Sequence, residues 1–292
     1  MQELVVLSGK GGTGKTSLVG ALAALGEKLA LCDADVDAPD LHLLLGPQII
    51  ERHDFSAGRK ANIRERDCWQ CGDCLRWCRF QAISDDFRVD PLRCEGCGVC
   101  WSLCPAGAVD FPENLCGQWF LADTRFGPLV HARLGVAAEN SGKLVALLRR
   151  EARRLAEAQG LEWLITDGPP GIGCPVMAAL GEATAVLLVT EPSLSGQHDL
   201  QRVAALTDHF RLPGFVLVNK ADLHWPMARA IRKFCDLQGY RFLGYLPFSP
   251  AFTQAQVEGK TILEYDRDNQ INQVIAGLWK RIRRELQKQD PH

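Results

Sequence analysis

The sequence predicts a doubly wound α/β fold with a mostly parallel sheet, interrupted by a small, cysteine-rich α+β unit. The first observation is that short apolar segments alternate with helical patterns along most of the 292 residues, which is typical of a parallel sheet covered by helices on both faces. The second is that this alternation stops between about residues 59 and 111, where eight of the twelve cysteines gather. We therefore expect one α/β domain built from residues 1–58 and 112–292, with residues 59–111 inserted as a second domain.

The expected strands are short, apolar or β-branched, and bounded by glycine, proline or aspartate. They cover residues 3–8, 28–32, 161–167, 184–190, 214–220 and 241–247. Helical periodicity separates the strands, as in residues 142–158, where Leu144, Leu148 and Leu155 share one face. The arginines at 149, 150, 153 and 154 lie opposite that face, which we expect to be solvated.

The composition narrows the classes of protein to consider. A net charge of -2 gives no overall basic field, so we expect no nucleic-acid partner. The N-terminal residues show no basic leader followed by an apolar core, and no apolar run is long enough to span a bilayer. Many cysteines without an export signal indicate metal ligation in a reducing compartment. We therefore expect a cytoplasmic protein without a membrane partner.

A glycine-rich loop follows the first expected strand and opens the first expected helix. Residues 9–16 read GKGGTGKT, which matches the phosphate-binding pattern G-x-x-x-x-G-K-[ST]. Glycines let backbone N–H groups curl around phosphates, while Lys15 would place positive charge at the β- and γ-phosphates and Thr16 an oxygen on Mg²⁺. The sequence thus predicts a P-loop NTPase with a nucleotide site formed by Gly9, Lys10, Gly11, Gly12, Thr13, Gly14, Lys15, Thr16 and Ser17.

The loop contains a second lysine, Lys10, which distinguishes it from an ordinary phosphate-binding loop and relates it to a known family. The string KGGTGKT resembles the deviant Walker A motif of the MinD/ParA family, which includes nitrogenase iron protein and the Mrp-type cluster carriers. The resemblance covers the chain apart from the insert. It implies a Mg²⁺-dependent ATPase in which Lys10 and Lys15 are catalytic, with Lys10 reaching the nucleotide of a partner subunit. It therefore implies an ATP-dependent homodimer, or a heterodimer with a similar ATPase.

The same resemblance assigns residues at the carboxyl ends of strands, where open α/β sheets place ligands. Asp35 matches the family position that activates water, and Asp33 and Asp167 match positions in the Mg²⁺ shell, Asp167 being followed by Gly-Pro-Pro-Gly. Asn219 resembles the adenine-reading position, and Pro247 lies in a segment that resembles the loop beside the base. Asp37 and Asp40 are expected to be turn formers or helix caps, and for Asn219 a structural role stays equally open.

Two cysteine runs share the spacing C-x2-C-x2-C-x3-C, about 26 residues apart. In this spacing three thiolates wrap one [4Fe–4S] cubane, and the fourth cysteine ligates the other cluster. We therefore expect a dicluster ferredoxin-like insert, with zinc as the rejected alternative. Tryptophans at 69, 77 and 101 are expected to form its small core or to shield the clusters. The expected ligands are Cys68, Cys71, Cys74 and Cys104 for cluster 1, and Cys94, Cys97, Cys100 and Cys78 for cluster 2.

Residues 125–143 resemble a segment of MinD-like ATPases that also carry a ferredoxin insert. The segment holds His131, Glu139, Asn140, Ser141 and Lys143. Asn140 or Ser141 is expected to cap the following helix. His131 is expected to be structural rather than a ligand.

Together these features predict an ATP-hydrolysing iron–sulfur protein. We expect a nucleotide-gated dimer that couples ATP to electron transfer, or to metallocofactor or iron–sulfur assembly, through two [4Fe–4S] clusters and a redox or assembly partner of unknown identity. The C-terminal CxxC of Mrp-type carriers is absent from this sequence. The alternative is a MinD-like positioning or scaffolding switch in which the clusters only sense redox state.

Overall fold

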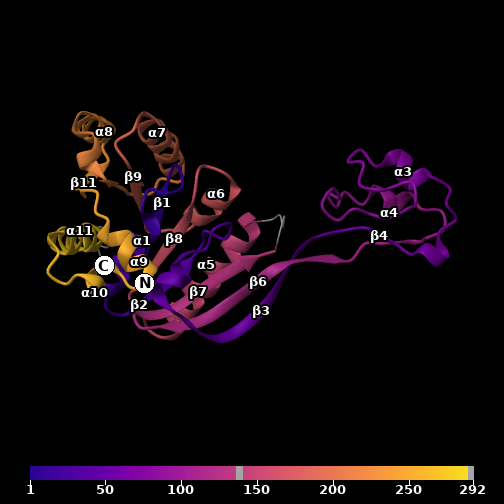
Figure 1. The fold of residues 1–292 in the computed structure, drawn as a ribbon, viewed down its shortest axis with the longest axis horizontal. Helices are drawn as coiled ribbons and strands as arrows, with labels where there is room; N and C mark the ends of the chain where they lie inside the picture. The colour runs from indigo at the N-terminus through magenta and orange to yellow at the C-terminus, as the bar shows by residue number, and fades with distance from the viewer. Residues whose placement is uncertain (136–140, 289–292) are drawn as a thin grey trace. The chain divides into compact units, whose positions relative to one another are not determined.

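The computed structural model describes residues 1–135 and 141–288 (Figure 1). Within them the chain divides into two compact units. The first is made of residues 1–53, 119–133 and 141–288, and the second of residues 54–118 with 134–135. The expected insert, residues 59–111, lies within the second unit. Of the segment at 125–143, Glu139 and Asn140 lie outside the described residues, and Ser141 opens a helix.

The elements alternate along the chain as the sequence predicts. The strands are β1 (Gln2–Ser8), β2 (Leu29–Asp33), β3 (Gln48–Arg59), β4 (Asn62–Ile63), β5 (Val109–Asp110), β6 (Glu113–Thr124), β7 (Gly127–Leu134), β8 (Trp163–Pro170), β9 (Ala185–Thr190), β10 (Gly214–Val218) and β11 (Arg241–Tyr245). The helices are α1 (Lys15–Leu25), α2 (Leu41–Leu45), α3 (Asp73–Trp77), α4 (Val99–Leu103), α5 (Ser141–Ala158), α6 (Cys174–Leu180), α7 (Leu194–His209), α8 (Trp225–Gln238), α9 (Ala251–Val257), α10 (Ile262–Tyr265) and α11 (Gln270–Gln287), with 3₁₀ turns η1 (Glu65–Asp67) and η2 (Ala221–Leu223).

One sheet organises the first unit, in the order β11-β10-β9-β1-β8-β2-β7-β6-β3. Its pairings from β11 to β7 are parallel, so the predicted doubly wound, mostly parallel fold is confirmed. Figure 1 shows these strands with helices on either side. Successive side chains of a strand face opposite ways: Leu4 and Val6 join a core with α1, α2 and α11, whereas Glu3 faces α5.

The far edge of the sheet departs from the expectation. Strands β3, β6 and β7 were not predicted, and α2 and β3 separate the insert from the second strand. Most of β3 is exposed, and its sequence QIIERHDFSAGR mixes charges with scattered apolar residues. A period-2 apolar pattern marks a strand only where one face is buried, so the sequence carried little signal here.

The second unit contains an internal duplication. Helices α3 and α4 pack together and each begins after a glycine in the left-handed region, Gly72 at φ 83° and Gly98 at φ 76°. A two-stranded antiparallel sheet, β4 with β5, closes the unit. The two glycines repeat the spacing of the two cysteine runs, so the duplication seen in the sequence is also structural.

Arg149 corrects the expectation of a solvated arginine face on α5. It is only 6% exposed, and its Nε and Nη2 atoms donate to the two carboxylate oxygens of Glu3, each at 2.8 Å. Arg153 and the Thr166 hydroxyl donate to the same carboxylate. Glu3 points from β1 towards α5, so this buried cluster joins the central strand to a covering helix. Within the described residues, no helix is long and apolar enough to cross a membrane.

We predict that Glu3→Gln lowers the free energy of unfolding of the α/β unit by about 3 kcal/mol, because it leaves a buried guanidinium without its counter-charge. Urea titration followed by circular dichroism measures the loss. Glu182→Gln is the matched control, because it removes an exposed partner of Arg153 and should change stability by well under about 1 kcal/mol. Equal effects of the two variants would contradict the assignment.

Candidate nucleotide and cysteine sites

The glycine-rich loop joins β1 to α1, at the centre of the sheet. Gly12 and Gly14 have φ values of 76° and 92°, a region that only glycine enters without strain. A Cβ atom on Gly14 would also lie 2.5 Å from Nδ2 of Asn219. Lys15 is buried at the first position of α1. The glycines are therefore required by backbone conformation and by close packing.

A cavity of about 460 Å³ opens beside this loop. Its walls come from five predicted segments: the loop and start of α1, the segment after β2, the end of β8, the residues that follow β10, and those that follow β11. Leu246 and Phe248, on either side of Pro247, line it. The predicted site residues that line it are Gly11, Gly12, Gly14, Lys15, Thr16, Ser17, Asp35 and Asn219.

Two aspartates are fully buried at the ends of neighbouring strands. Asp33 on β2 pairs in register with Asp167 on β8. Burial raises the pKa of Asp167 to about 6, against the lowering effects of Lys15 and the Thr16 hydroxyl. Burial also raises the pKa of Asp33 well above its ordinary range, and the nearby Asp167 charge raises it further. Neither buried oxygen of Asp167 accepts a hydrogen bond of normal geometry in the described part of the chain, so the nearby Thr16 hydroxyl and Lys15 ammonium compensate its charge only in part. Such a donor set fits a hard divalent cation.

Asp33 and Asp35 have different partners. The carboxylate of Asp33 accepts backbone N–H bonds from Asp35 at 3.2 Å and from Leu41 at 3.1 Å. Asp35 lies 3.8 Å from the Lys15 ammonium and lines the cavity. Asp33 is therefore tied into the segment that leads to α2, whereas Asp35 is presented to the cavity.

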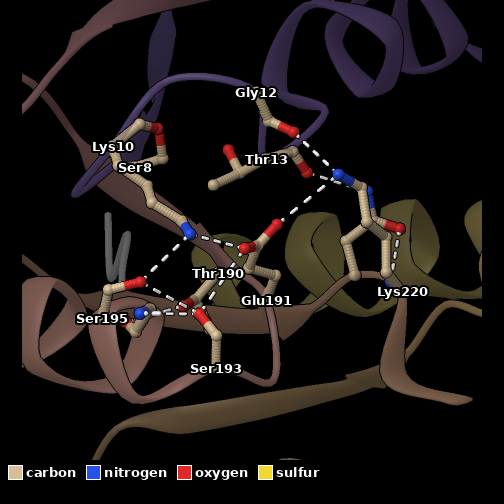
Figure 2. A network of polar contacts seen from close by, with 11 residues as sticks. Ser8, Lys10, Gly12, Thr13, Thr190, Glu191, Ser193, Ser195 and Lys220 are labelled. Carbon is tan, nitrogen blue, oxygen red and sulfur yellow. Dashed lines mark hydrogen bonds and ion pairs between the residues drawn. The ribbon is translucent and has the colours of Figure 1, made fainter. Parts of the chain in front are cut away.

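Lys10 is held by its own chain (Figure 2). Its ammonium donates to Glu191 and, at 3.2 Å, to the Ser195 hydroxyl. Lys220 approaches the other oxygen of Glu191 at 3.5 Å and donates to the Gly12 carbonyl at 2.9 Å. Burial alone would raise the pKa of Glu191, but the hydrogen bond and charge of Lys10, with Lys220, lower it. Glu191 therefore neutralises two lysines beside the loop.

The sequence did not single out Glu191. A carboxylate two residues before a helix cap has an ordinary explanation as a surface charge, and only the fold brings it to Lys10. Asn219 has both ends of its amide engaged, with Nδ2 donating to the Thr13 carbonyl at 2.8 Å and Oδ1 accepting from the Lys220 N–H at 2.9 Å. In this structure Asn219 supports the loop, which is the structural role left open above.

The cysteines of the second unit group as two sets. Cys78 from the first run lines the same small cavity as Cys94, Cys97 and Cys100 from the second run. Burial raises the pKa of Cys100 to about 11, with a further contribution from the charges of Cys94 and Cys97. Burial likewise raises the pKa of Cys74, and the charges of Cys68, Cys71 and Cys104 add to it. Cys78 therefore lies with the second run by the cavity that they share. The charge of Cys104 acts on Cys74, and that of Cys74 acts in turn on Cys100, so the two runs lie close together. Among the described residues, no three His, Cys, Asp or Glu side chains converge as a group that could hold a metal ion.

The three tryptophans beside the cysteines correct another expectation. Trp69, Trp77 and Trp101 are 70%, 60% and 56% exposed, so they do not form the core of this unit. Within the expected insert, residues 59–111, the buried apolar residues are small or β-branched: Ala61, Ala82, Ile83, Ala108 and Val109. A unit this short buries few large side chains, which explains why the tryptophans remain at its surface.

Comparison with known proteins agrees with the nucleotide site. Residues 4–262 match the CobQ/CobB/MinD/ParA nucleotide binding domain. The chain belongs to this family. Two uncharacterized proteins of Methanocaldococcus jannaschii are similar over almost its whole length: one is 27% identical over 289 residues, 97% of each chain, and the other is 25% identical over 281 residues, 94% of this chain and 96% of the relative. The septum site-determining protein MinD of Pyrococcus horikoshii, solved with Mg-ADP, shares the MinD-like fold with a TM-score of 0.60 at 15% identity, covering 100% of this chain and 99% of that one.

We predict that Asp167→Asn stabilises the divalent-free protein several-fold more at pH 8 than at pH 4. A folded-state pKa of about 6 lies above the ordinary value of 3.8, so the folded chain binds this proton more tightly than the unfolded chain does. Asp167 therefore costs stability increasingly as pH rises from about 4 through 6. Thermal unfolding at both pH values measures the difference, and Asp123→Asn, on an exposed carboxylate, is the control. A gain of equal size at both pH values would contradict the burial effect.

Proposed function

We propose that this chain is a Mg²⁺-dependent ATPase of the MinD/ParA type that works as a nucleotide-gated dimer and couples ATP to iron–sulfur chemistry. The observation that carries the ATPase part is Asp167. Its two buried oxygens accept no hydrogen bond of normal geometry among the described residues, and the nearby Lys15 and Thr16 compensate its charge only in part. A buried, incompletely compensated carboxylate lowers the stability of the folded chain. A cation bound together with phosphates would offset that loss.

We assign the loop residues roles that the geometry supports. Backbone N–H groups of the loop and the N-terminus of α1 would hold the phosphates, and Lys15 would contact the β- and γ-phosphates. Thr16 would ligate Mg²⁺, with Asp33 and Asp167 in its shell. Lys15 now pairs with Asp35 at 3.8 Å. A triphosphate would draw Lys15 towards it and free Asp35 to orient the attacking water.

The proposed dimer requires Lys10 to change partners. In this structure Lys10 donates to Glu191 and Ser195 of its own chain. To reach a nucleotide in the partner subunit it must leave them, and Lys220 stays beside Glu191 to compensate its charge. A heterodimer is the alternative to a homodimer, since one organism holds two relatives that each match this chain over almost its full length.

The iron–sulfur part rests on the crossed grouping of the cysteines. Cys78 lines the cavity of Cys94, Cys97 and Cys100, which supports the exchange of the fourth ligand that two [4Fe–4S] clusters require of this spacing. We propose Cys68, Cys71, Cys74 and Cys104 for the other cluster. Such clusters supply one-electron transfer at low potential. ATP would then drive electron transfer, or metallocofactor assembly, towards a redox or assembly partner protein.

A second candidate function is a positioning or scaffolding switch whose clusters only sense redox state. The MinD-like fold favours it. The two candidates differ in the fate of the electron. An ATP-driven donor passes it to an acceptor during turnover, whereas a sensor keeps it and changes its affinity for a partner. An anaerobic pull-down with ATP and with ADP, followed by mixing the reduced protein with the captured partner, separates them.

For the nucleotide site, we predict that Lys15→Ala abolishes ATP binding, because the phosphates lose their buried cationic partner. Asp35→Ala should keep binding within about ten-fold and lower turnover by about 10²-fold or more, as loss of a group that orients the nucleophile does. Calorimetry and phosphate release measure the two effects. Lys28→Ala, on an exposed lysine, is the control. A wild-type chain without affinity for ATP would contradict the proposal.

For the clusters, we predict that anaerobically prepared protein holds about eight irons. Cys78→Ser should lose about four of them, and the signal that disappears should be that of the cluster ligated by Cys94, Cys97 and Cys100. Cys174→Ser is the matched control, since Cys174 is exposed and lies outside both runs. Iron analysis and electron paramagnetic resonance give the readout. Equal iron loss in both variants, or zinc in place of iron, would contradict the assignment.

A further inference from the structure

Two histidines meet between the segment after β2 and the edge of the sheet. His42 on α2 and His131 on β7 have nearly parallel rings, with centroids 5.6 Å apart and an interplanar angle of 3°. The ring centroid of Phe120 on β6 lies 5.0 Å from that of His131. His131 is only 7% exposed. Each histidine has a buried nitrogen that finds no hydrogen-bond partner among the described residues, Nδ1 of His42 and Nε2 of His131. Two unpaired nitrogens therefore sit on neighbouring rings.

The two nitrogens could satisfy each other. A neutral imidazole has one N–H donor and one acceptor nitrogen, so a single N–H···N bond between the rings would pair both atoms. Burial lowers the pKa of His131 to about 4. Burial also lowers the pKa of His42, with Arg133 adding to it and Asp40 opposing it. Both rings are thus neutral near pH 7, as such a bond needs. Buried polar groups are normally paired, which indicates a second arrangement in which these two are.

Helix α2 is the element whose movement would make that bond. It has only five residues and is held at both ends. At its start, the Leu41 N–H donates to Asp33 at 3.1 Å. At its end, Arg125 donates to the Leu45 carbonyl at 2.6 Å and to the Leu44 carbonyl at 3.0 Å. A change in the orientation of the Asp33 carboxylate therefore acts directly on the first residue of α2, one position before His42.

We propose that His42 and His131 are positioning residues of the nucleotide site. When Mg²⁺ and nucleotide draw Asp33 away from Leu41, α2 shifts, and Nδ1 of His42 and Nε2 of His131 join in a hydrogen bond. That bond holds α2, and through it Asp33, in the nucleotide-bound position. This inference rests on the proposed binding of Mg²⁺ and ATP, and it deepens that function by naming what stabilises the bound state.

Formation of this hydrogen bond would also affect the second unit, because the two units are connected by continuous strands. Arg125 occupies the turn between β6 and β7, and its Nε and Nη2 atoms also bind Glu264. His131 lies on β7 and Phe120 on β6, while β3 follows α2. Strands β3 and β6 continue into the second unit. A shift of α2 would therefore displace β3 and β6, the strands that connect to the cysteine-rich second unit.

The test compares two substitutions of His131. His131→Phe keeps an aromatic ring beside Phe120 and removes the nitrogen, whereas His131→Gln retains a polar group near the position of Nε2. Calorimetry with Mg²⁺ and a non-hydrolysable ATP analogue measures affinity, and thermal unfolding without nucleotide measures stability. We expect His131→Phe to lower the affinity for the analogue about five-fold, which is the effect of one lost hydrogen bond. Its nucleotide-free melting temperature should stay the same or rise, because an unpaired buried atom is gone. His131→Gln should recover most of the affinity.

A double-mutant cycle with His42→Leu completes the test. If the two nitrogens bond to each other, His42→Leu with His131→Phe together should cost no more analogue affinity than either alone. Additive losses would overturn the proposal, as would unchanged affinity in all variants, or a His131→Phe chain that is destabilised without nucleotide while affinity is kept. A wild-type chain that binds no analogue would instead overturn the proposed ATPase function, so the two failures are distinguishable.

Discussion

Two buried carboxylates at the ends of neighbouring parallel strands set the constraint on which the rest of this structure depends. Asp33 and Asp167 lie in register on β2 and β8, with no exposed surface and with raised pKa values. Like charges placed together in a low-dielectric interior repel and lose hydration. The sheet can hold them only because Lys15, the Thr16 hydroxyl and the N–H groups of Asp35 and Leu41 surround them. In our account a divalent cation and a triphosphate complete that neutralisation.

The same pair explains how the two units could communicate. Asp33 is bonded to the start of α2, α2 leads directly into β3, and Arg125 fastens the end of α2 to the turn between β6 and β7. In our proposal, the cysteine-rich unit is therefore inserted shortly after a segment that responds to the nucleotide. If ATP binding alters the clusters, cluster reduction must alter ATP affinity by the same free energy, because coupling between binding equilibria is reciprocal.

Much of the fold and site could be predicted where one local pattern has one physical cause. The loop at 9–16 needs glycines for its backbone, and buried parallel strands need unbroken apolar runs, so both were predicted. Strand β3 was missed because an exposed edge strand needs no apolar run. Strands β6 and β7 are partly buried and were missed because polar residues, such as His131 in β7, interrupt their apolar residues. Arg149 and Glu191 were missed for a different reason. Their partners are 146 and 181 residues away in the sequence. Without the fold, a charged residue whose partner is so distant is interpreted as solvent-exposed. The three exposed tryptophans show the opposite error, since large apolar residues in a very small unit need not be its core.

The most direct test of the central claim, that nucleotide and clusters are coupled, is a redox titration. The anaerobic protein would be titrated under electron paramagnetic resonance without nucleotide, with ADP, and with a non-hydrolysable ATP analogue in the presence of Mg²⁺. The account predicts that the midpoint potential of at least one cluster shifts with the ATP analogue and that Asp167→Asn removes the shift. Three superimposable titrations of a protein with its full iron content would contradict it, and would leave the second unit a passive electron relay or a structural element.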